Sequence, residues 1–202
     1  IGDYIIHENS GMFLRKTRER APAPVTMTGV RMGERLLQIG VDDPATAGAI
    51  AAKVGLSGSA ALAVADEAGA ERARRAAANA GALVDVCVAP LNALPFPDEG
   101  FDVVVVHDVR GLIGLEAPAR TAALHQCHRV LRRGGRIITV EPGIRSGIFG
   151  RLGALLRQPD NTPANAAGGM AAFLEAAGFR PVRVVGKLDG FTFTEGLKPA
   201  SR

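Results

Sequence analysis

The chain has 202 residues, of which 47% are hydrophobic and 22% are charged, so it can bury one substantial core and we expect a single folded domain. The formal net charge is +4 at pH 7, and the basic excess is gathered in residues 15–20 and 145–157. We interpret these clusters as solvated surface charge, with an acidic partner as the alternative. With no Trp and a single Tyr to stack on bases, we expect no nucleic-acid partner.

Nothing in the sequence predicts export or insertion into a membrane. No run approaches the roughly 20 apolar residues that cross a bilayer, and the first residues lack a basic region followed by a small-residue cleavage site. Cys87 and Cys127 lie in apolar segments, where buried reduced thiols are more common than a disulfide. We therefore expect a cytoplasmic protein.

Strands and helices alternate through the middle of the chain. Short apolar runs predict five strands, at residues 35–39, 60–65, 84–88, 101–106 and 136–140. The helices predicted between them cover residues 44–54, 68–80 and 118–131. The first of these has Asp43 as N-cap and Pro44 at the first helical position. The unbroken valines of the fourth strand indicate burial on both faces, as in the middle of a parallel sheet.

The last third of the chain departs from this alternation. Residues 143–168 combine apolar side chains with three arginines, a pattern typical of an amphipathic helix or a lid. We expect ordinary packing on the sheet; a lid over the site that meets an apolar acid or a membrane surface is the alternative. A helix at residues 170–177 then precedes strands at 180–185 and 191–194, which are close enough to form a hairpin. The whole pattern predicts an α/β fold with a doubly wound, mostly parallel, seven-stranded sheet and a C-terminal antiparallel hairpin.

The residues before the first strand lie outside this pattern. We expect residues 1–30 to form an N-terminal arm near the ligand edge of the sheet, and residues 31–202 to form the α/β domain. Apolar residues of the arm have two open roles, covering the cleft or mediating a homodimer. They are Tyr4, Ile5, Ile6, Met12, Phe13 and Leu14.

Two stretches carry a family resemblance. The sequence LPFPDEGFD at residues 94–102 leads into the fourth strand, and RVLRRGGR at residues 129–136 leads into the fifth strand, which ends at Glu141, Pro142 and Gly143. These stretches resemble the class I S-adenosylmethionine-dependent methyltransferases, especially the type 11 group that acts on small molecules. The resemblance covers roughly residues 33–194.

The resemblance implies that S-adenosylmethionine lies across the carboxyl ends of the strands. The first strand in the family runs into an acidic residue and a glycine-rich loop. Here Gln38 stands at the acidic position, Gly40 matches the first glycine, and Asp42 and Pro44 stand at later glycine positions. Pro44 lacks an N–H donor and Asp43 caps the helix, so the loop is unsuited to the phosphates of a dinucleotide. A cofactor that carries an ammonium and a sulfonium tolerates Asp42.

Two further cofactor contacts follow from the resemblance. Asp66, with Glu67 after it, stands where the family places the acid that accepts from the ribose hydroxyls, a task that needs two acceptor oxygens. Capping of the next helix is an equally open role for Asp66. After the third strand, the family places an acid that reads the adenine amino group. Asn92 is the nearest polar substitute here.

A substrate base is expected at the end of the fourth strand, where His107 and Asp108 stand. Histidine has a pKa near neutrality and can accept a proton from a hydroxyl or amine; a structural hydrogen bond is the alternative role of His107. No set of Cys, His and carboxylate residues has the spacing of metal ligands, so we expect no metal.

Two functions therefore stay open. The first is transfer of a methyl group from S-adenosylmethionine to a small-molecule acceptor, which would be acidic or apolar. The alternative is a non-catalytic methyltransferase-like protein that has lost cofactor binding and serves as an interaction module. A nicotinamide oxidoreductase ranks third because the glycines of the dinucleotide loop are missing.

Overall fold

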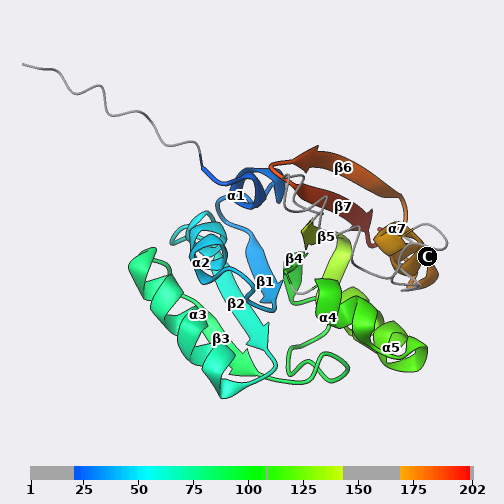
Figure 1. The fold of residues 1–202 in the computed structure, drawn as a ribbon, viewed down its shortest axis with the longest axis horizontal. Coiled ribbons are helices and arrows are strands. Elements are labelled where there is room, and N and C mark those ends of the chain that lie inside the picture. Colours follow the sequence, from blue (N-terminus) through cyan, green and yellow to red (C-terminus); the bar gives the residue numbers. More distant parts are fainter. Residues whose placement is uncertain (1–20, 108, 143–168, 201–202) are drawn as a thin grey trace, which may run out of the picture.

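The described residues of this computed structural model, 21–107, 109–142 and 169–200, form a seven-stranded mixed sheet (Figure 1). Its order is β3-β2-β1-β4-β5-β7-β6. The strands are β1 (Arg35–Ile39), β2 (Ser59–Val64), β3 (Asp85–Val88), β4 (Phe101–Val106), β5 (Leu131–Pro142), β6 (Val182–Leu188) and β7 (Phe191–Leu197). Neighbours from β3 to β5 run parallel, whereas β7 is antiparallel to both β5 and β6. The predicted fold class is confirmed.

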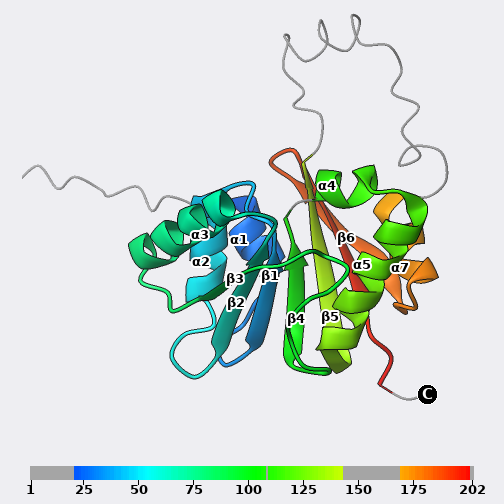
Figure 2. The same cartoon turned by 90° about the horizontal axis from the view of Figure 1, so that it is seen from below.

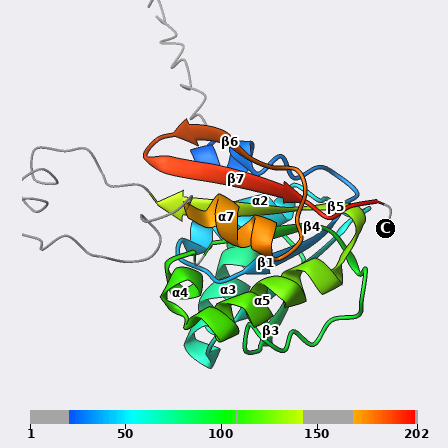
Figure 3. The ribbon, with the colours of Figure 1, turned by 90° about the vertical axis from the view of Figure 1, so that its right-hand side faces the viewer.

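Helices cover both faces of the sheet. They are α1 (Ala23–Met27), α2 (Pro44–Ala52), α3 (Glu67–Asn79), α4 (Val109–Gly114), α5 (Ala117–Val130) and α7 (Gly169–Ala176). In Figure 3, α4, α5 and α7 lie together below the strands β5 and β7, and Figure 1 shows α1, α2 and α3 gathered on the other side. The winding therefore reverses between β1 and β4, which places a ligand edge at their carboxyl ends.

A hydrophobic core lies on each face of the sheet. The central strand β4 contributes side chains to both cores, because successive side chains of a strand point to opposite faces. Val103 and Val105 pack with residues of α1 and α2, while Val104 and Val106 pack with residues of α4, α5 and α7. All four valines are at most 1% exposed. This confirms the prediction that a continuous valine run lies in the middle of a parallel sheet.

The predicted starts of α2 and α3 are confirmed by the side chains that cap these helices. Asp43 accepts hydrogen bonds from Ala45 N at 3.2 Å and from Thr46 Oγ1 at 2.5 Å, and Pro44 begins α2. Asp66 caps α3 by accepting from Gly69 N at 2.6 Å. Both caps satisfy N–H groups that have no partner within the helix.

Four elements differ from the sequence prediction. Strand β5 begins at Leu131, five residues before the predicted start, because Leu131 pairs with Phe101 and the strand continues through an irregular stretch to Arg136. Gly134 has a φ of +70°, which glycine adopts readily. Helix α4 was not predicted. The hairpin strands are also longer, so that Asp189 and Gly190, both with positive φ, make its turn.

The two stretches that carry the family resemblance meet around Arg129. Its guanidinium donates to Leu94 O at 2.9 Å, to Phe96 O at 2.8 Å and to the Asp98 carboxylate at 2.6 Å. Arg129 thereby ties the approach to β4 against α5. A single arginine can do this because its planar fork presents five donors.

The described part of the predicted arm packs on the sheet through α1. Ala23 and Val25 belong to the same core as Leu36 and Ile50, and Lys53 Nζ donates to Val25 O at 2.9 Å. Residues 1–20 of the arm and residues 143–168, expected to pack on the sheet or to form a lid, lie outside the described residues. No described helix has both the length and the apolar character needed to cross a bilayer.

Candidate functional site

The carboxyl ends of β1 and β4 lie side by side at the ligand edge. Ile39 pairs with Val106, and the residue directly after β4, His107, donates its backbone N–H to Ile39 O at 2.9 Å. Gly40 turns the chain away from β1 with a φ of +77°, and its N–H donates to Ala63 O at 2.9 Å. A side chain at this position would be strained, so glycine suits the turn. Figure 2 shows α4 just beyond the end of β4.

Gln38 and His107 form a buried polar pair beneath this edge. Gln38 is fully buried, and His107 is 5% exposed. Gln38 Nε2 donates to the carbonyl of Ala47 in α2 at 3.0 Å, and Gln38 Oε1 lies 2.7 Å from His107 Nε2. Both ends of the Gln38 amide are therefore used inside the protein. This buried position does not offer the amide to a ligand at the surface of the cleft.

Burial controls the charge of His107. It lowers the pKa of the imidazole to about 4, although the carboxylate of Asp43 acts in the opposite direction. The ring is therefore neutral at pH 7. A neutral imidazole has one N–H donor and one nitrogen with a lone pair, so His107 can accept a proton.

His107 opens onto a small cavity at the ligand edge, with a volume of about 170 Å³. Residues from six parts of the fold line this cavity, namely Pro24, Asp42, Asp43, Thr46, His107, Val140, Pro142 and Phe191. Its walls are mainly apolar, with two acidic side chains and one imidazole among them. Apolar walls with a few polar groups are typical of small-molecule sites.

Several contributors to this cavity were not identified from the sequence, and two of them come from opposite ends of the described chain. Pro24 comes from α1 and Phe191 from the start of β7, and the two residues are far apart in the chain. Neither residue has a local sequence signal for a binding role. Only the return of the C-terminal hairpin to β5 brings Phe191 to this edge, where it pairs with Pro142.

The other predicted cofactor residues lie toward β2 and β3. Asp66 is exposed, and its Oδ1 accepts the hydrogen bond that caps α3. Glu67 forms an ion pair with Arg74 at 2.8 Å. Asn92 is exposed in the turn after β3. None of the three lines the cavity beside His107. The structure thus brings together Gln38, His107 and the Asp42 loop, and it leaves Asp66, Glu67 and Asn92 in the segments that follow β2 and β3.

Glu141 is the last residue but one of β5 and lies on the opposite face of the sheet from the Val140 side chain. It accepts hydrogen bonds from Thr194 Oγ1 at 3.1 Å and Thr139 Oγ1 at 3.4 Å. Burial raises the pKa of Glu141, while these hydrogen bonds and Lys187 act to lower it. The two threonines come from strands that pair directly, so Glu141 serves to join β5 and β7 at this end.

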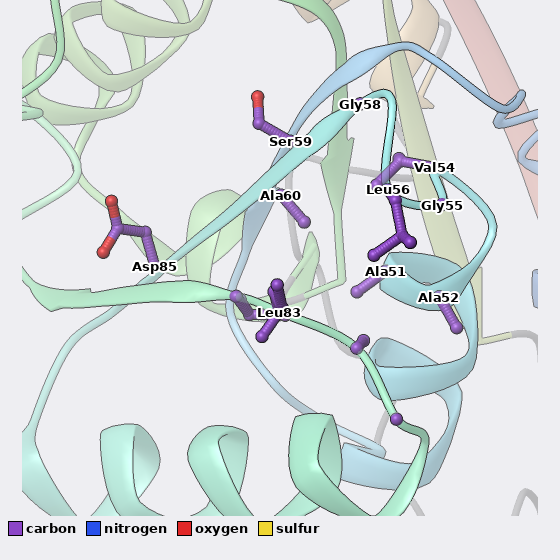
Figure 4. A pocket seen from close by; sticks show the side chains of 13 residues that line it. Ala51, Ala52, Val54, Gly55, Leu56, Gly58, Ser59, Ala60, Leu83 and Asp85 are labelled. Atoms are coloured by element: carbon purple, nitrogen blue, oxygen red, sulfur yellow. The ribbon is translucent and has the colours of Figure 1, made fainter.

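A larger cavity, of about 520 Å³, lies at the opposite edge of the sheet, around the amino ends of β2 and β3 (Figure 4). Leu56, from the turn after α2, and Leu83, from the approach to β3, lie on two sides of it. It contains none of the predicted site residues. In open α/β sheets, ligands bind at the carboxyl ends of the strands, so we do not assign the site to this cavity.

The residues at the ligand edge are compatible with S-adenosylmethionine in their chemistry. Gly40 offers backbone without a Cβ, and Asp42 adds an acidic side chain that suits an ammonium or sulfonium group. Asp66 uses Oδ1 in its cap, but a carboxylate has a second oxygen that can accept from ribose hydroxyls. The cofactor carboxylate fits less well, because Asp43 already caps α2.

Comparison with known proteins agrees with the fold. Residues 45–139 match the family model described as a methyltransferase domain. The chain is 31% identical over 117 residues to the ubiquinone/menaquinone biosynthesis C-methyltransferase UbiE of Cupriavidus necator, an alignment that covers 58% of this chain and 46% of that protein. The chain thus spans about half the length of the curated relative that it matches.

Solved structures with the same fold include a methyltransferase and a protein whose name states no activity. A SAM-dependent methyltransferase from Aquifex aeolicus superimposes with a TM-score of 0.64 at 18% identity, over 87% of this chain and 89% of that one. The YcgJ protein from Bacillus subtilis gives a TM-score of 0.60 at 15% identity, over 88% and 97%. The sheet order and these solved structures show that the chain has the class I methyltransferase fold, and within that fold residues 45–139 match the methyltransferase domain.

Proposed function

We propose that this protein transfers the methyl group of S-adenosylmethionine to a small-molecule acceptor held at the ligand edge of the sheet. The observation that carries the proposal is the cavity beside His107, in which a neutral imidazole lies among apolar walls at the carboxyl ends of β4 and β5. When bound, S-adenosylmethionine supplies an electrophilic methyl group on a sulfonium centre.

Three positions of this chain would hold the cofactor. Gly40 would let the methionine part approach the backbone closely, Asp42 would face its positive groups, and Asp66 would accept from the ribose hydroxyls. Glu67 and Asn92 lie next along the same edge, and Asn92 is the side chain we assign to adenine. The buried Gln38 would act on the site through His107 and not by direct contact.

His107 would act on the acceptor and not on the cofactor. Its lone pair can take the proton of a hydroxyl or an amine as the acceptor atom becomes nucleophilic. The apolar side chains of Val140, Pro142 and Phe191 would exclude water from that atom. Most of the rate gain in such a transfer comes from holding two reactants in line, which the cavity walls would do.

The first test is calorimetric titration with S-adenosylmethionine and S-adenosylhomocysteine, with NAD as a control. Asp66→Ser is the informative variant, because serine keeps the α3 cap but removes the second acceptor oxygen. We expect affinity to fall by about tenfold or more, as it does when a charged hydrogen-bond partner is lost. Unchanged affinity would remove Asp66 from the site.

The alternative is a non-catalytic member of the superfamily that serves as an interaction module. It is favoured by one observation, that the Asp43 carboxylate fills the N-terminus of α2, where an anionic ligand group would otherwise bind. Absence of binding at millimolar S-adenosylmethionine would support this alternative. The predicted homodimer stays a prediction, and light scattering of the full chain tests it.

A further inference from the structure

We infer that Gln38 is a positioning residue, which holds His107 in the tautomer that carries its proton on Nε2 and leaves the lone pair on Nδ1. The role of that lone pair in accepting a proton rests on the function proposed above. The tautomer itself is a property of the free protein and can be measured without cofactor or acceptor.

The direction of the Gln38 amide follows from its partner in α2. A backbone carbonyl can only accept hydrogen bonds, so the group 3.0 Å from Ala47 O must be the amide NH₂. The amide oxygen then faces His107 Nε2 at 2.7 Å. Because that oxygen can only accept, Nε2 must donate, and in a neutral imidazole the other nitrogen, Nδ1, then has no proton.

Three separate elements fix this arrangement. Gln38 lies in β1, Ala47 in α2, and His107 directly after β4. The backbone N–H of His107 also bonds to Ile39 O, so the ring is anchored at the main chain and at Nε2. A buried hydrogen bond of this kind is costly to leave unmade, which makes the competing Nδ1–H tautomer unfavourable.

An acid at position 38 could not do the same work. A carboxylate has no N–H to donate to Ala47 O, and it would stabilise a doubly protonated imidazolium at His107. Among the described residues, the ionisable groups that line the cavity beside the ring are Asp42 and Asp43, from the loop before α2, and Asp43 acts on the charge of the ring. The other cavity walls, from α1, α2, β5 and β7, carry no charge. Glutamine therefore keeps the imidazole neutral, with a free base on the remaining nitrogen.

A structural role alone would make Gln38 a buried amide that any well-packed side chain could replace. The two roles differ in what happens to the ring. If Gln38 sets the tautomer, an apolar side chain at position 38 frees the ring to redistribute its proton. If Gln38 only fills space, the ring is unaffected while stability changes.

The test is nitrogen NMR of the histidine side chains in the ¹⁵N-labelled full chain without ligand. His107→Asn assigns the signal. We expect wild-type His107 to be a single neutral tautomer, with the proton on Nε2, at pH 7. Gln38→Leu should give a mixture of tautomers, and Gln38→Glu should give a ring protonated on both nitrogens at the same pH. A wild-type proton on Nδ1, or an unchanged tautomer in both variants, would overturn the inference.

Matched controls separate the tautomer from global damage. His125→Asn changes an exposed histidine of α5 and should leave the His107 signal in place. If Gln38→Leu fails to fold, Gln38→Glu still tests whether Gln38 sets the tautomer of His107, because glutamate retains the size of the side chain. Circular dichroism establishes that each variant is folded before its spectrum is compared.

Kinetics then link the tautomer to function once an acceptor has been found. Gln38→Glu should lower kcat about tenfold or more at pH 7, because it removes the free base, while KM for the acceptor changes much less. Unchanged kcat and an unchanged pH profile would overturn the positioning role. If the protein binds no S-adenosylmethionine and yet shows the fixed tautomer, the proposed methyl transfer fails and the Gln38–His107 arrangement stands.

Discussion

Gly48 of α2 faces the carbonyl oxygen of Ala76 in α3 so closely that a Cβ built on Gly48 would lie 2.5 Å from it. The same Cβ would lie 3.2 Å from Ala80 Cβ. The two helices therefore pack with backbone against backbone. This contact matters for the site because α2 carries both the Asp43 cap and the carbonyl that holds Gln38.

Gly48→Ala should lower the free energy of unfolding by about 2 kcal/mol, as overpacking of a close contact usually does, despite the better helix propensity of alanine. The matched control is Gly114→Ala, which also lies in a helix but where no atom of the described residues would lie within 4 Å of an added Cβ. We expect the control to be neutral or slightly stabilising. Urea unfolding measures both, and equal stability of the two variants would show that α2 and α3 can separate at little cost.

The buried His107 should make stability depend on pH in a defined window. Its pKa of about 4 in the fold is below the ordinary value of 6.5, so between pH 4 and 6.5 the unfolded chain binds a proton that the folded protein does not. Stability should therefore rise with pH across that window, by about 3 kcal/mol in total, and gain nothing more from this group above it.

His107→Gln should abolish that part of the pH dependence, because glutamine does not titrate. Chemical unfolding of the wild type and the variant at several values between pH 4 and 7 gives the two curves. Parallel curves would show that His107 is not held neutral by burial, and the proposed base would then lose its physical support.

Local signals in the sequence predicted the caps and the central strand. Asp43 followed by Pro44 marks a helix start by short-range chemistry, and the valines of β4 report burial on both faces directly. The start of β5 was missed because the residues around Arg132 continue a helical pattern. The pairing of Leu131 with Phe101, which makes them a strand, joins residues 30 positions apart.

The candidate site was predictable only in part for the same reason. Gly40 and Asp42 follow from the family resemblance and His107 from its place at the end of a strand, and all three stay predictions as site residues. The bond between Gln38 and His107 joins residues 69 positions apart, and no sequence spacing reports it. The sequence therefore placed Gln38 at the ligand as a substitute for an acid, whereas the structure shows both of its polar ends buried within the protein.

Removing the Arg129 clamp should destabilise the approach to β4. Arg129→Ala leaves the carbonyl oxygens of Leu94 and Phe96 without these donors, and we expect a loss of about 2 kcal/mol in urea unfolding. Arg75→Ala serves as control, because Arg75 makes an exposed ion pair with Glu71 that contributes at most about 0.5 kcal/mol. If the two variants lose equal stability, the clamp is no stronger than a surface pair.

Asp102 should make stability depend on pH in acid, below the range from pH 4 to pH 6.5 in which His107 acts. It accepts from the backbone and side chain of Arg35 and from Arg132. Burial acts to raise the pKa of Asp102, but these hydrogen bonds prevail and hold it at about 2, below the ordinary value of 3.8. A carboxyl with a lowered pKa stabilises the fold at neutral pH, and that contribution is lost as the pH falls from about 4 to about 2.

Asp102→Asn should therefore cost about 2 kcal/mol at pH 7 and flatten the stability curve between pH 4 and pH 2. Glu67→Gln is the matched control, because it removes a carboxylate whose partner, Arg74, is bound at the exposed surface of α3. Thermal unfolding at low salt over that range measures both variants. The opposing result is that Glu67→Gln flattens the pH dependence of stability between pH 4 and pH 2 as much as Asp102→Asn does. The loss of stability in acid would then arise from the net charge of the protein and not from the contacts that join β4 to β1 and β5.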